Sequence, residues 1–283
     1  MLNSFNEFVT DGVHKKVDSK EDEDSLMVKR LKPILLVKMI DKFNMSQCMV
    51  FCRTNLDCEL LADYLASIDG GLKFTHARDT GKEAKYSCAV LGGMKSMAER
   101  RASLEAFKEG AVRILLCTDV AARGIDIRGL PFVINYTLPD EPEFYIHRIG
   151  RVGRAEHLGL AISILAPQHV EERVWYHICS NRGKLCNDTR LKSDGGCTIW
   201  YNENDFFNAI QRRLDLAIPE LSANMDLPES LASFGVKYGE KMTIEEPVFN
   251  SHIELLEPTV RELAVMEMEA QNLFLRFRTQ YKA

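Results

Sequence analysis

The chain has 283 residues, of which 46% are apolar, and it carries a formal net charge of -5. This length exceeds that of one ordinary domain. Because the net charge is negative, the protein as a whole does not attract nucleic acid, and any binding of nucleic acid needs a local basic surface. No apolar stretch approaches the roughly 20 residues that span a bilayer, and the N-terminus has no signal-peptide pattern, so we expect no membrane contact.

Residues 1–25 are polar and acidic, and we expect a flexible lead-in there. A helical periodicity runs from Leu26 to Asn44, with Pro33 tolerated near its start. An alternation of strands and helices follows. Strands are predicted at 48–52, 86–91, 112–117, 131–136 and 159–165, and helices at 55–67, 97–109 and 141–149.

These strands are apolar on both faces and are separated by helices. The pattern therefore predicts an α/β domain over residues 26–178, with a parallel sheet flanked by helices. Ligands of such sheets bind beyond the carboxyl ends of the strands. The connection from Ile68 to Lys85 is long and polar, and we interpret it as a surface insertion.

The C-terminal part has a less regular pattern. A helix is predicted at 170–178, a short strand at 197–201 and a helix at 205–216. We assign residues 179–217 to an extension of the domain and residues 218–257, which contain three prolines, to an irregular arm. Residues 258–283 are predicted to form a C-terminal amphipathic helix.

The eight cysteines are scattered along the chain. Five of them lie in apolar strand or helix patterns: Cys48, Cys52, Cys58, Cys88 and Cys117. Buried thiols of this kind fit a reducing compartment better than a disulfide framework. We therefore expect the protein in the cytoplasm and the nucleus.

Two segments carry most of the chemical information. The first runs from Thr118 to Asp126 with the sequence TDVAARGID, and the second from His147 to Arg154 with the sequence HRIGRVGR. Arginines recur every third residue in the second segment, which would place them near one face of a helix. Such a cluster is most stable where polyphosphate or carboxylate neutralises it, although a solvated basic helix face is the simpler alternative.

In order and in separation, the two segments resemble motifs V and VI of the DEAD-box RNA helicases. His147 supports this family, because the related DEAH group has Gln at that place. The resemblance implies the second, RecA-like domain of such a helicase. The chain has no Gly-x-x-x-x-Gly-Lys-Ser/Thr loop and no Asp-Glu-Ala-Asp run. The family would bind ATP between two domains, with the Mg²⁺ ligands on the missing N-terminal domain, so this fragment alone should be inactive.

The resemblance also implies roles for single residues. Arg151 and Arg154 would be the catalytic arginine fingers on ATP, which Gly124, Asp126 and Arg148 would also contact. His147 and Arg148 would face the missing domain. RNA-backbone contacts would come from Arg53, Thr54, Gly93, Arg100, Thr118 and Asp119, although an Arg at the position of Arg53 could instead brace the next loop. Gly92 and Met97 depart from the usual His and Gln of the family.

Val152 and the segments 174–179, 187–192 and 195–201 resemble a DEAD-box subgroup whose first domain contains a SPRY insertion. That subgroup belongs to a tRNA ligase complex in animals. In the extension, His177, Cys179, Cys186 and Cys197 could be four metal ligands, or the cysteines could pack as small apolar residues. Because no Cys-x-x-Cys pair is present, we expect no metal.

The C-terminal helix has an apolar seam formed by Leu263, Met266, Ala270, Leu273 and Phe277, which Phe274 widens. The seam could pack on its own domain, or it could bind partner subunits through Leu263, Leu273, Phe274 and Phe277. The sequence thus predicts the C-terminal half of an ATP-dependent RNA helicase. The alternative is an ATP-gated RNA clamp or scaffold subunit of an RNA ligase complex that acts in tRNA splicing.

Overall fold

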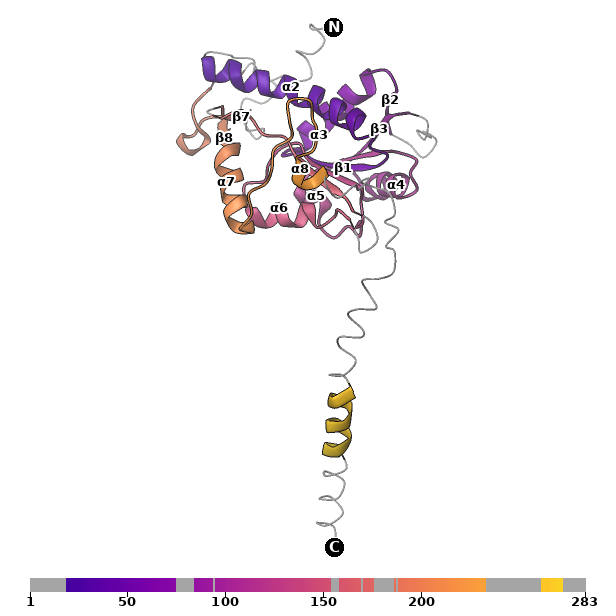
Figure 1. Cartoon of the computed structure of the whole chain (residues 1–283). Helices are drawn as coiled ribbons and strands as arrows, with labels where there is room; N and C mark the ends of the chain where they lie inside the picture. The colour runs from indigo at the N-terminus through magenta and orange to yellow at the C-terminus, as the bar shows by residue number, and fades with distance from the viewer. Residues whose placement is uncertain are drawn as a thin grey trace. The chain divides into compact units, whose positions relative to one another are not determined.

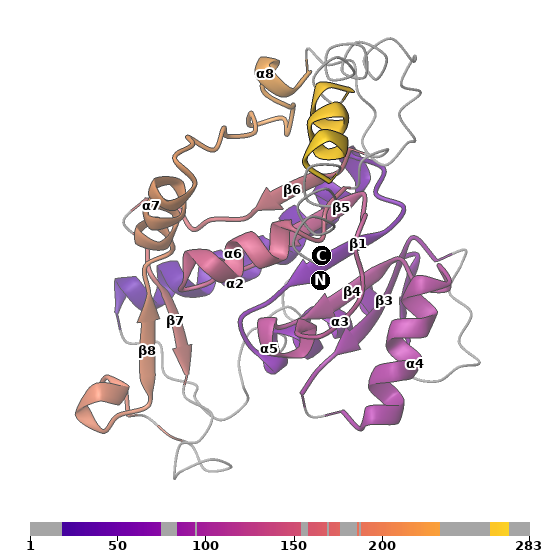
Figure 2. The same ribbon diagram turned by 90° about the horizontal axis from the view of Figure 1, so that it is seen from below.

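Six short strands form one parallel sheet in the order β2-β3-β4-β1-β5-β6 (Figures 1 and 2). The computed structural model describes residues 19–74, 84–93, 95–153, 158–168, 170–175, 186, 188–232 and 261–271. The strands are β1 (Cys48–Phe51), β2 (Gly71–Lys73), β3 (Tyr86–Leu91), β4 (Ile114–Cys117), β5 (Phe132–Asn135) and β6 (Leu160–Ser163). This arrangement confirms the predicted parallel α/β sheet.

Helices cover both faces of the sheet. They are α2 (Lys20–Lys42), α3 (Asn55–Ser67), α4 (Met97–Lys108), the single turn α5 (Asp119–Ala122) and α6 (Pro142–Ile149). Because successive strand residues point to opposite faces, Val50 packs in the core beneath α2 and α3, whereas Met49 and Phe51 pack beneath α4 and α5. None of the described helices is both long and apolar enough to cross a membrane.

The edge strand β2 lies within the connection from Ile68 to Lys85, for which the sequence predicts a surface insertion and no strand. Its first residue, Gly71, approaches the end of α3 so closely that a Cβ atom there would lie 1.9 Å from the carbonyl oxygen of Leu65. Only glycine fits this approach. The hydrophobic pattern missed the strand because all three of its residues are only half-buried.

The predicted helix at 170–178 is wrong in its described part. Residues Glu172–Trp175 form strand β7, which pairs antiparallel with β8 (Thr198–Tyr201) and is followed by α7 (Glu203–Leu214). A strand of four residues is too short for periodicity to identify, and here the distant partner β8 determines the conformation. The strand at 197–201 and the helix at 205–216 are confirmed within a few residues.

The arm predicted at 218–257 begins as part of the domain. Leu221, Met225 and Leu227 pack against the core beneath α2, and Lys42 forms an ion pair with Asp226 at 2.6 Å. The short helix α8 (Glu229–Ala232) follows. The chain divides into two compact units, Met1–Lys241 and Met242–Ala283, and residues 261–271 of the second unit are helical.

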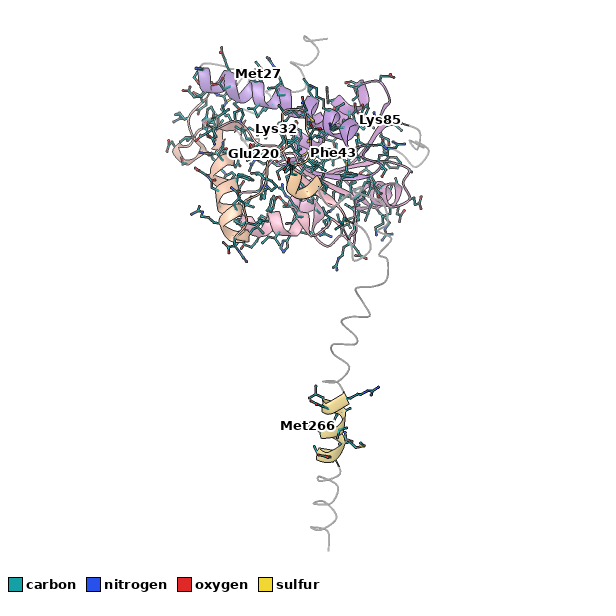
Figure 3. The ribbon with its side chains drawn as sticks, in the orientation of Figure 1. Met27, Lys32, Phe43, Lys85, Glu220 and Met266 are labelled. Atoms are coloured by element: carbon teal, nitrogen blue, oxygen red, sulfur yellow. The ribbon has the colours of Figure 1, made fainter. Side chains whose placement is uncertain are left out.

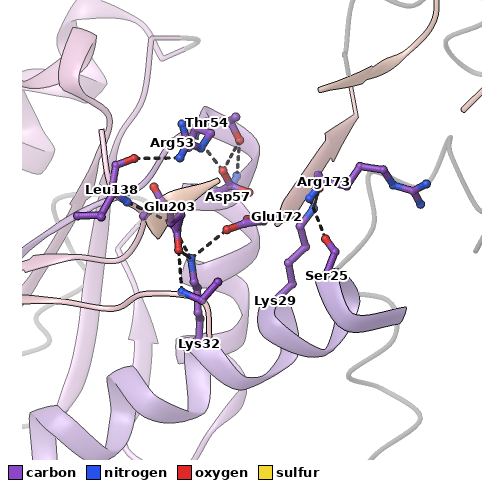
Figure 4. A network of polar contacts seen from close by, with 12 residues as sticks. Ser25, Lys29, Lys32, Arg53, Thr54, Asp57, Leu138, Glu172, Arg173 and Glu203 are labelled. Carbon is purple, nitrogen blue, oxygen red and sulfur yellow. Dashed lines mark hydrogen bonds and ion pairs between the residues drawn. The ribbon is translucent and has the colours of Figure 1, made fainter. Parts of the chain in front are cut away.

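A buried ion network joins β7 and α7 to α2 (Figure 4). The ammonium of Lys32 lies 2.9 Å from the carboxylate of Glu172 on β7 and 2.9 Å from that of Glu203 on α7. The three side chains are at most 5% exposed. Glu203 also accepts hydrogen bonds from the backbone N–H groups of Leu138 and Ala166. One lysine thus connects α2, the hairpin and the loops that follow two strands of the sheet.

The backbone of β7 is held to the same helix. The N–H of Arg173 donates to Ser25 Oγ at 2.8 Å, and Lys29 Nζ donates to the Arg173 carbonyl oxygen. The Arg173 guanidinium pairs with the buried carboxylate of Asp22. Figure 3 shows Lys32 directed into the body of the domain, whereas Met27 on the outer side of α2 is exposed. The extension is therefore an integral layer of this unit.

Burial by itself lowers the pKa of Lys32, but the two carboxylates raise it above its ordinary value. Burial raises the pKa of Glu172, but Lys32 holds it below its ordinary value. The stability from Glu172 is present above its unfolded pKa of about 4.3 and is lost as the pH falls through the folded pKa. The stability from Lys32 is present below its unfolded pKa of about 10.4 and is lost as the pH rises through the folded pKa.

Replacing Lys32 with alanine should lower the free energy of unfolding by about 3–5 kcal/mol, because two buried carboxylates lose their counter-charge. Urea unfolding followed by circular dichroism measures this loss. The control is Lys42→Ala, which removes the exposed pair with Asp226 and should cost less than about 1 kcal/mol. Equal losses in the two variants would show that the network does not hold the extension.

Candidate functional site

The carboxyl ends of the central strands bring the predicted site residues to one edge of the sheet. Arg53 and Thr54 follow β1, Gly93 follows β3, and Thr118 and Asp119 follow β4. The helix α6 lies across the same edge and carries His147 and Arg148. This edge is where parallel sheets bind their ligands.

Arg148 is the centre of this edge and is only 1% exposed. Its Nε and Nη2 atoms donate to the two carboxylate oxygens of Asp119, each at 2.7 Å. Its Nη1 donates to Asn135 Oδ1 at 3.1 Å and to the Thr137 carbonyl oxygen at 2.6 Å. Four of the five guanidinium N–H groups are therefore used inside the domain. Arg148 also lies over the ring of Phe51, 5.0 Å from its centre.

This geometry corrects the prediction that the three arginines lie near one face of a helix. The helix α6 ends at Ile149, and Gly150 follows as its C-cap, so the three-residue spacing does not continue along one helix. The sequence also expected Arg148 to face ATP and the missing domain. Four of its five N–H groups instead donate to Asp119 and to acceptors at the end of β5, so within this chain Arg148 joins motif V to motif VI.

Arg151 is half-buried and lies beside the loop that follows α5. Its Nη1 donates to the carbonyl oxygens of Ile125 and Ile127, and its Nη2 donates to that of Ala122 at 3.4 Å. Two of the five guanidinium N–H groups have no acceptor in these bonds. Arg151 is thus oriented by motif V and keeps donors for a ligand. Arg154 lies outside the described residues.

A cavity of about 240 Å³ opens between α5 and α6, and its walls include Gly124, His147, Arg148 and Arg151. Gly124 has a φ of 74°, a conformation that L side chains rarely adopt, and no atom lies near its missing Cβ. Four of the lining side chains are arginine or histidine and one is the carboxylate of Asp119. The cavity is therefore suited to an anionic ligand.

The other predicted residues have more local contacts. Thr118 caps α5, and its hydroxyl accepts from the N–H of Ala121. Arg100 donates to the Ala121 carbonyl oxygen at 3.2 Å and so joins α4 to α5. The N–H of Gly93 donates to Asn55 Oδ1. Asp126 is exposed, and its charged neighbour is Arg128 at 4.0 Å.

Arg53 braces a loop, which is one of the two roles that the sequence left open. Its guanidinium pairs with Asp140, donates to the Leu138 carbonyl oxygen at 2.9 Å and lies 3.7 Å from the centre of the Tyr201 ring. The side chain of Thr54 caps α3 in a capping box with Asp57. These side chains are engaged within the domain. Of the predicted RNA contacts, Gly93 is exposed and Arg100 is half-buried.

Sequence reasoning missed several residues of this edge. Arg123 and Phe144 line the cavity, and the Arg123 guanidinium lies 5.1 Å from the centre of the Phe144 ring. Arg123 belongs to the quoted motif and could have been found from it. Asn135, which accepts from Arg148, could have been found as a polar residue at the end of a buried strand. No sequence pattern indicated Tyr201, whose ring contacts the Arg53 guanidinium.

The chain matches the family of the helicase conserved C-terminal domain over residues 31–156. It is 45% identical to the ATP-dependent RNA helicase DDX1 of Xenopus laevis, over 95% of this chain and 36% of that protein. It is 37% identical to the ATP-dependent RNA helicase Ddx1 of Drosophila virilis, over 94% of this chain and 67% of that protein. The chain belongs to the DDX1 family of DEAD-box RNA helicases.

The chain spans only 36% of the length of its Xenopus relative, in which it corresponds to one part of a longer protein. Among solved structures, it is similar to a DEAD box protein from the hyperthermophile Methanococcus jannaschii, with 27% identity and a TM-score of 0.45 over 74% of this chain and 41% of that one. Family membership confirms the predicted resemblance, and the chain contains the C-terminal helicase domain of this family.

Replacing Arg148 with alanine should destabilise the chain by about 3–5 kcal/mol, because Asp119 and the acceptors on β5 lose a buried donor. Arg128→Ala is the matched control, since it removes an exposed guanidinium beside Asp126 and should cost less than about 0.5 kcal/mol. Thermal unfolding of both variants measures the difference. A melting temperature of Arg148→Ala equal to that of the control would contradict a structural role for Arg148.

Proposed function

We propose that this chain supplies the arginine-bearing half of an RNA-stimulated ATPase that separates RNA strands. The observation that carries this proposal is the position of Arg151 in the wall of a cavity suited to an anion. The motif V carbonyls orient its guanidinium, and two of its five N–H groups take no part in these bonds. Arginines in this role stabilise the charge of a transferring phosphoryl group, an effect worth about 10³–10⁵ in rate. Arg154 is proposed as the second arginine, from the sequence alone.

The residues of this edge fit one side of an ATP molecule. Arg151 would contact the terminal phosphate, and the exposed carboxylate of Asp126 would accept from the ribose hydroxyls. Gly124 leaves space where a side chain would otherwise stand. The Mg²⁺ ligands and the loop that holds the other phosphates would belong to the N-terminal domain. We therefore expect no ATP hydrolysis by this chain alone, and His147 is proposed to face that domain.

RNA would lie along the same edge, over α4 and the loop after β3. Arg100 supplies a positive charge there, and the backbone of Gly93 and the hydroxyl of Thr118 can contact phosphates without reading bases. The side chains of Arg53, Thr54 and Asp119 would act indirectly, because they hold the loops that carry these contacts. Binding through the backbone should be tolerant of sequence and sensitive to salt.

In the two-domain protein, Arg151→Ala should reduce RNA-stimulated ATP hydrolysis by at least about 100-fold, because the variant loses a donor that contacts the transferring phosphoryl group. The measurement is phosphate release at saturating RNA. Arg213→Ala is the control, since it removes an exposed arginine that pairs with Glu143 on α6 and should leave turnover unchanged. Normal turnover in a folded Arg151→Ala variant would contradict this proposal.

A second candidate function is an ATP-gated RNA clamp or scaffold subunit of an RNA ligase complex that acts in tRNA splicing. The helix at 261–271 favours it, because Leu263 and Met266 on the predicted seam are 59% and 64% exposed. The seam residues Leu273, Phe274 and Phe277 lie outside the described residues. The proposed compartments are the cytoplasm and the nucleus, consistent with seven described cysteines that are buried and form no disulfide.

The double variant Leu263→Asp/Met266→Asp should release partner subunits in a pull-down, because charge is placed on the apolar seam. The matched control is Val265→Asp/Met268→Asp, which alters similarly exposed residues off the seam of the same helix. Partners should remain bound to the control, and both variants should melt like the unmodified chain. Retention of the partners by the seam variant, or a melting temperature lowered by several degrees, would refute docking.

A further inference from the structure

Two features stand out in the described part of the extension. The first is the buried pair Cys186 and Cys197, which form no disulfide and belong to no group of three metal-ligand side chains among the described residues. The other two candidate ligands, His177 and Cys179, lie outside those residues. The second feature is the ring of Tyr201 at the end of β8, which contacts an arginine at the carboxyl edge of the sheet.

The ring of Tyr201 is a platform for the Arg53 guanidinium. The central carbon of the guanidinium lies 3.7 Å from the ring centre, well inside the range of about 6 Å over which a cation is attracted to an aromatic face. Phe206 on α7 meets the Tyr201 ring edge to face, with 6.3 Å between the ring centres, and lies 5.8 Å from the same guanidinium. Both rings belong to the extension, whereas Arg53 follows the central strand β1.

Arg53 joins these rings to the loop between β5 and α6. Its guanidinium pairs with Asp140, and its Nη2 donates to the Leu138 carbonyl oxygen at 2.9 Å (Figure 4). The side chain is only 9% exposed, and its Nε has no hydrogen-bond partner among the described residues. Because this buried donor is left unused, hydrogen bonds alone do not fix the plane of the guanidinium. The face of the Tyr201 ring supplies the missing constraint.

The loop that Arg53 contacts leads directly into α6, the helix that carries Arg148. Asp140 immediately precedes the N-cap residue of α6, and that residue makes no side-chain capping bond, so tertiary contacts hold the start of the helix. Leu138 is buried in a cluster with Tyr145 of α6 and Ile210 of α7. A displacement of the Arg53 side chain would therefore be felt at the start of α6.

We propose that Tyr201 is a positioning residue for ATP hydrolysis, which through Arg53 fixes the loop before α6 and hence the arginines that follow it. This inference rests on the proposed ATPase function. Tyr201 itself contacts neither ATP nor RNA in that proposal. Loss of its ring would misplace Arg151 slightly, and a small misplacement of a catalytic group slows the chemical step more than it weakens substrate binding.

The test measures kcat and KM for ATP in the two-domain protein at saturating RNA. Tyr201→Leu should lower kcat about tenfold and change KM less than about twofold, because the weakened contact is one made in the transition state. Tyr201→Phe keeps the ring and should restore a near-normal kcat. The matched control is Trp200→Leu, which removes the neighbouring ring of β8 that faces Arg173 at 5.6 Å, and it should leave both constants unchanged.

A double-mutant cycle tests whether Tyr201 acts through Arg53. Arg53→Ala should lower kcat by a similar factor, and Tyr201→Leu/Arg53→Ala should lower it no further, because both changes break the same contact. Losses that multiply in the double variant, or a normal kcat in either folded single variant, would overturn the inference. An equal loss in Tyr201→Phe and Tyr201→Leu would also overturn it.

Arg151→Ala separates the failure of this inference from that of the proposed function. If Arg151→Ala loses turnover while Tyr201→Leu and Arg53→Ala keep it, the ATPase proposal stands and the positioning role of Tyr201 is wrong. If a folded Arg151→Ala variant keeps normal turnover, the proposed function itself is contradicted. Thermal unfolding of every variant shows which of them are folded.

Discussion

Arg148 and Asp119 form a bidentate ion pair at the carboxyl edge of the sheet, and the arrangement of this edge depends on it. The pair joins the turn after β4 to the helix α6, two segments that are distant in the sequence. Arg148 is buried and is held by four hydrogen bonds at the end of α6. The chain that follows α6 then carries Arg151 to the motif V carbonyls. One buried guanidinium thus orients the arginine that can contact a ligand.

A second buried charged side chain, Lys32, also joins segments that are distant in the sequence. Lys32 is buried with two carboxylates, Glu172 from β7 and Glu203 from α7. A buried ion pair contributes little net stability compared with apolar packing, but breaking it is costly, so such pairs can fix one arrangement among several. The Lys32 network therefore specifies where β7 and α7 sit. Glu203 also accepts a hydrogen bond from the N–H of Leu138, and the carbonyl oxygen of Leu138 accepts from Arg53. The network is therefore connected to the loop that Arg53 contacts.

The sequence predicted those elements whose residues show a clear local pattern. The strands β1 and β4 are buried on both faces, so their apolar runs identified them and the edge at which ligands bind. It did not predict β7, whose buried charges on Glu172 and Arg173 pair with Lys32 and Asp22 of the distant helix α2. The resemblance also placed Arg148 against ATP and the missing domain, because a motif does not show that this side chain is buried against Asp119.

The central claim is that Arg148 is structural and that Arg151 is the arginine presented to the nucleotide. A crystal structure of the two-domain protein with RNA and a non-hydrolysable ATP analogue tests it most directly. The account predicts that Arg148 keeps its bidentate bond to Asp119 while Arg151 donates to the terminal phosphate. A structure in which Arg148 leaves Asp119 to bind the nucleotide, and Arg151 does not contact it, would contradict the account.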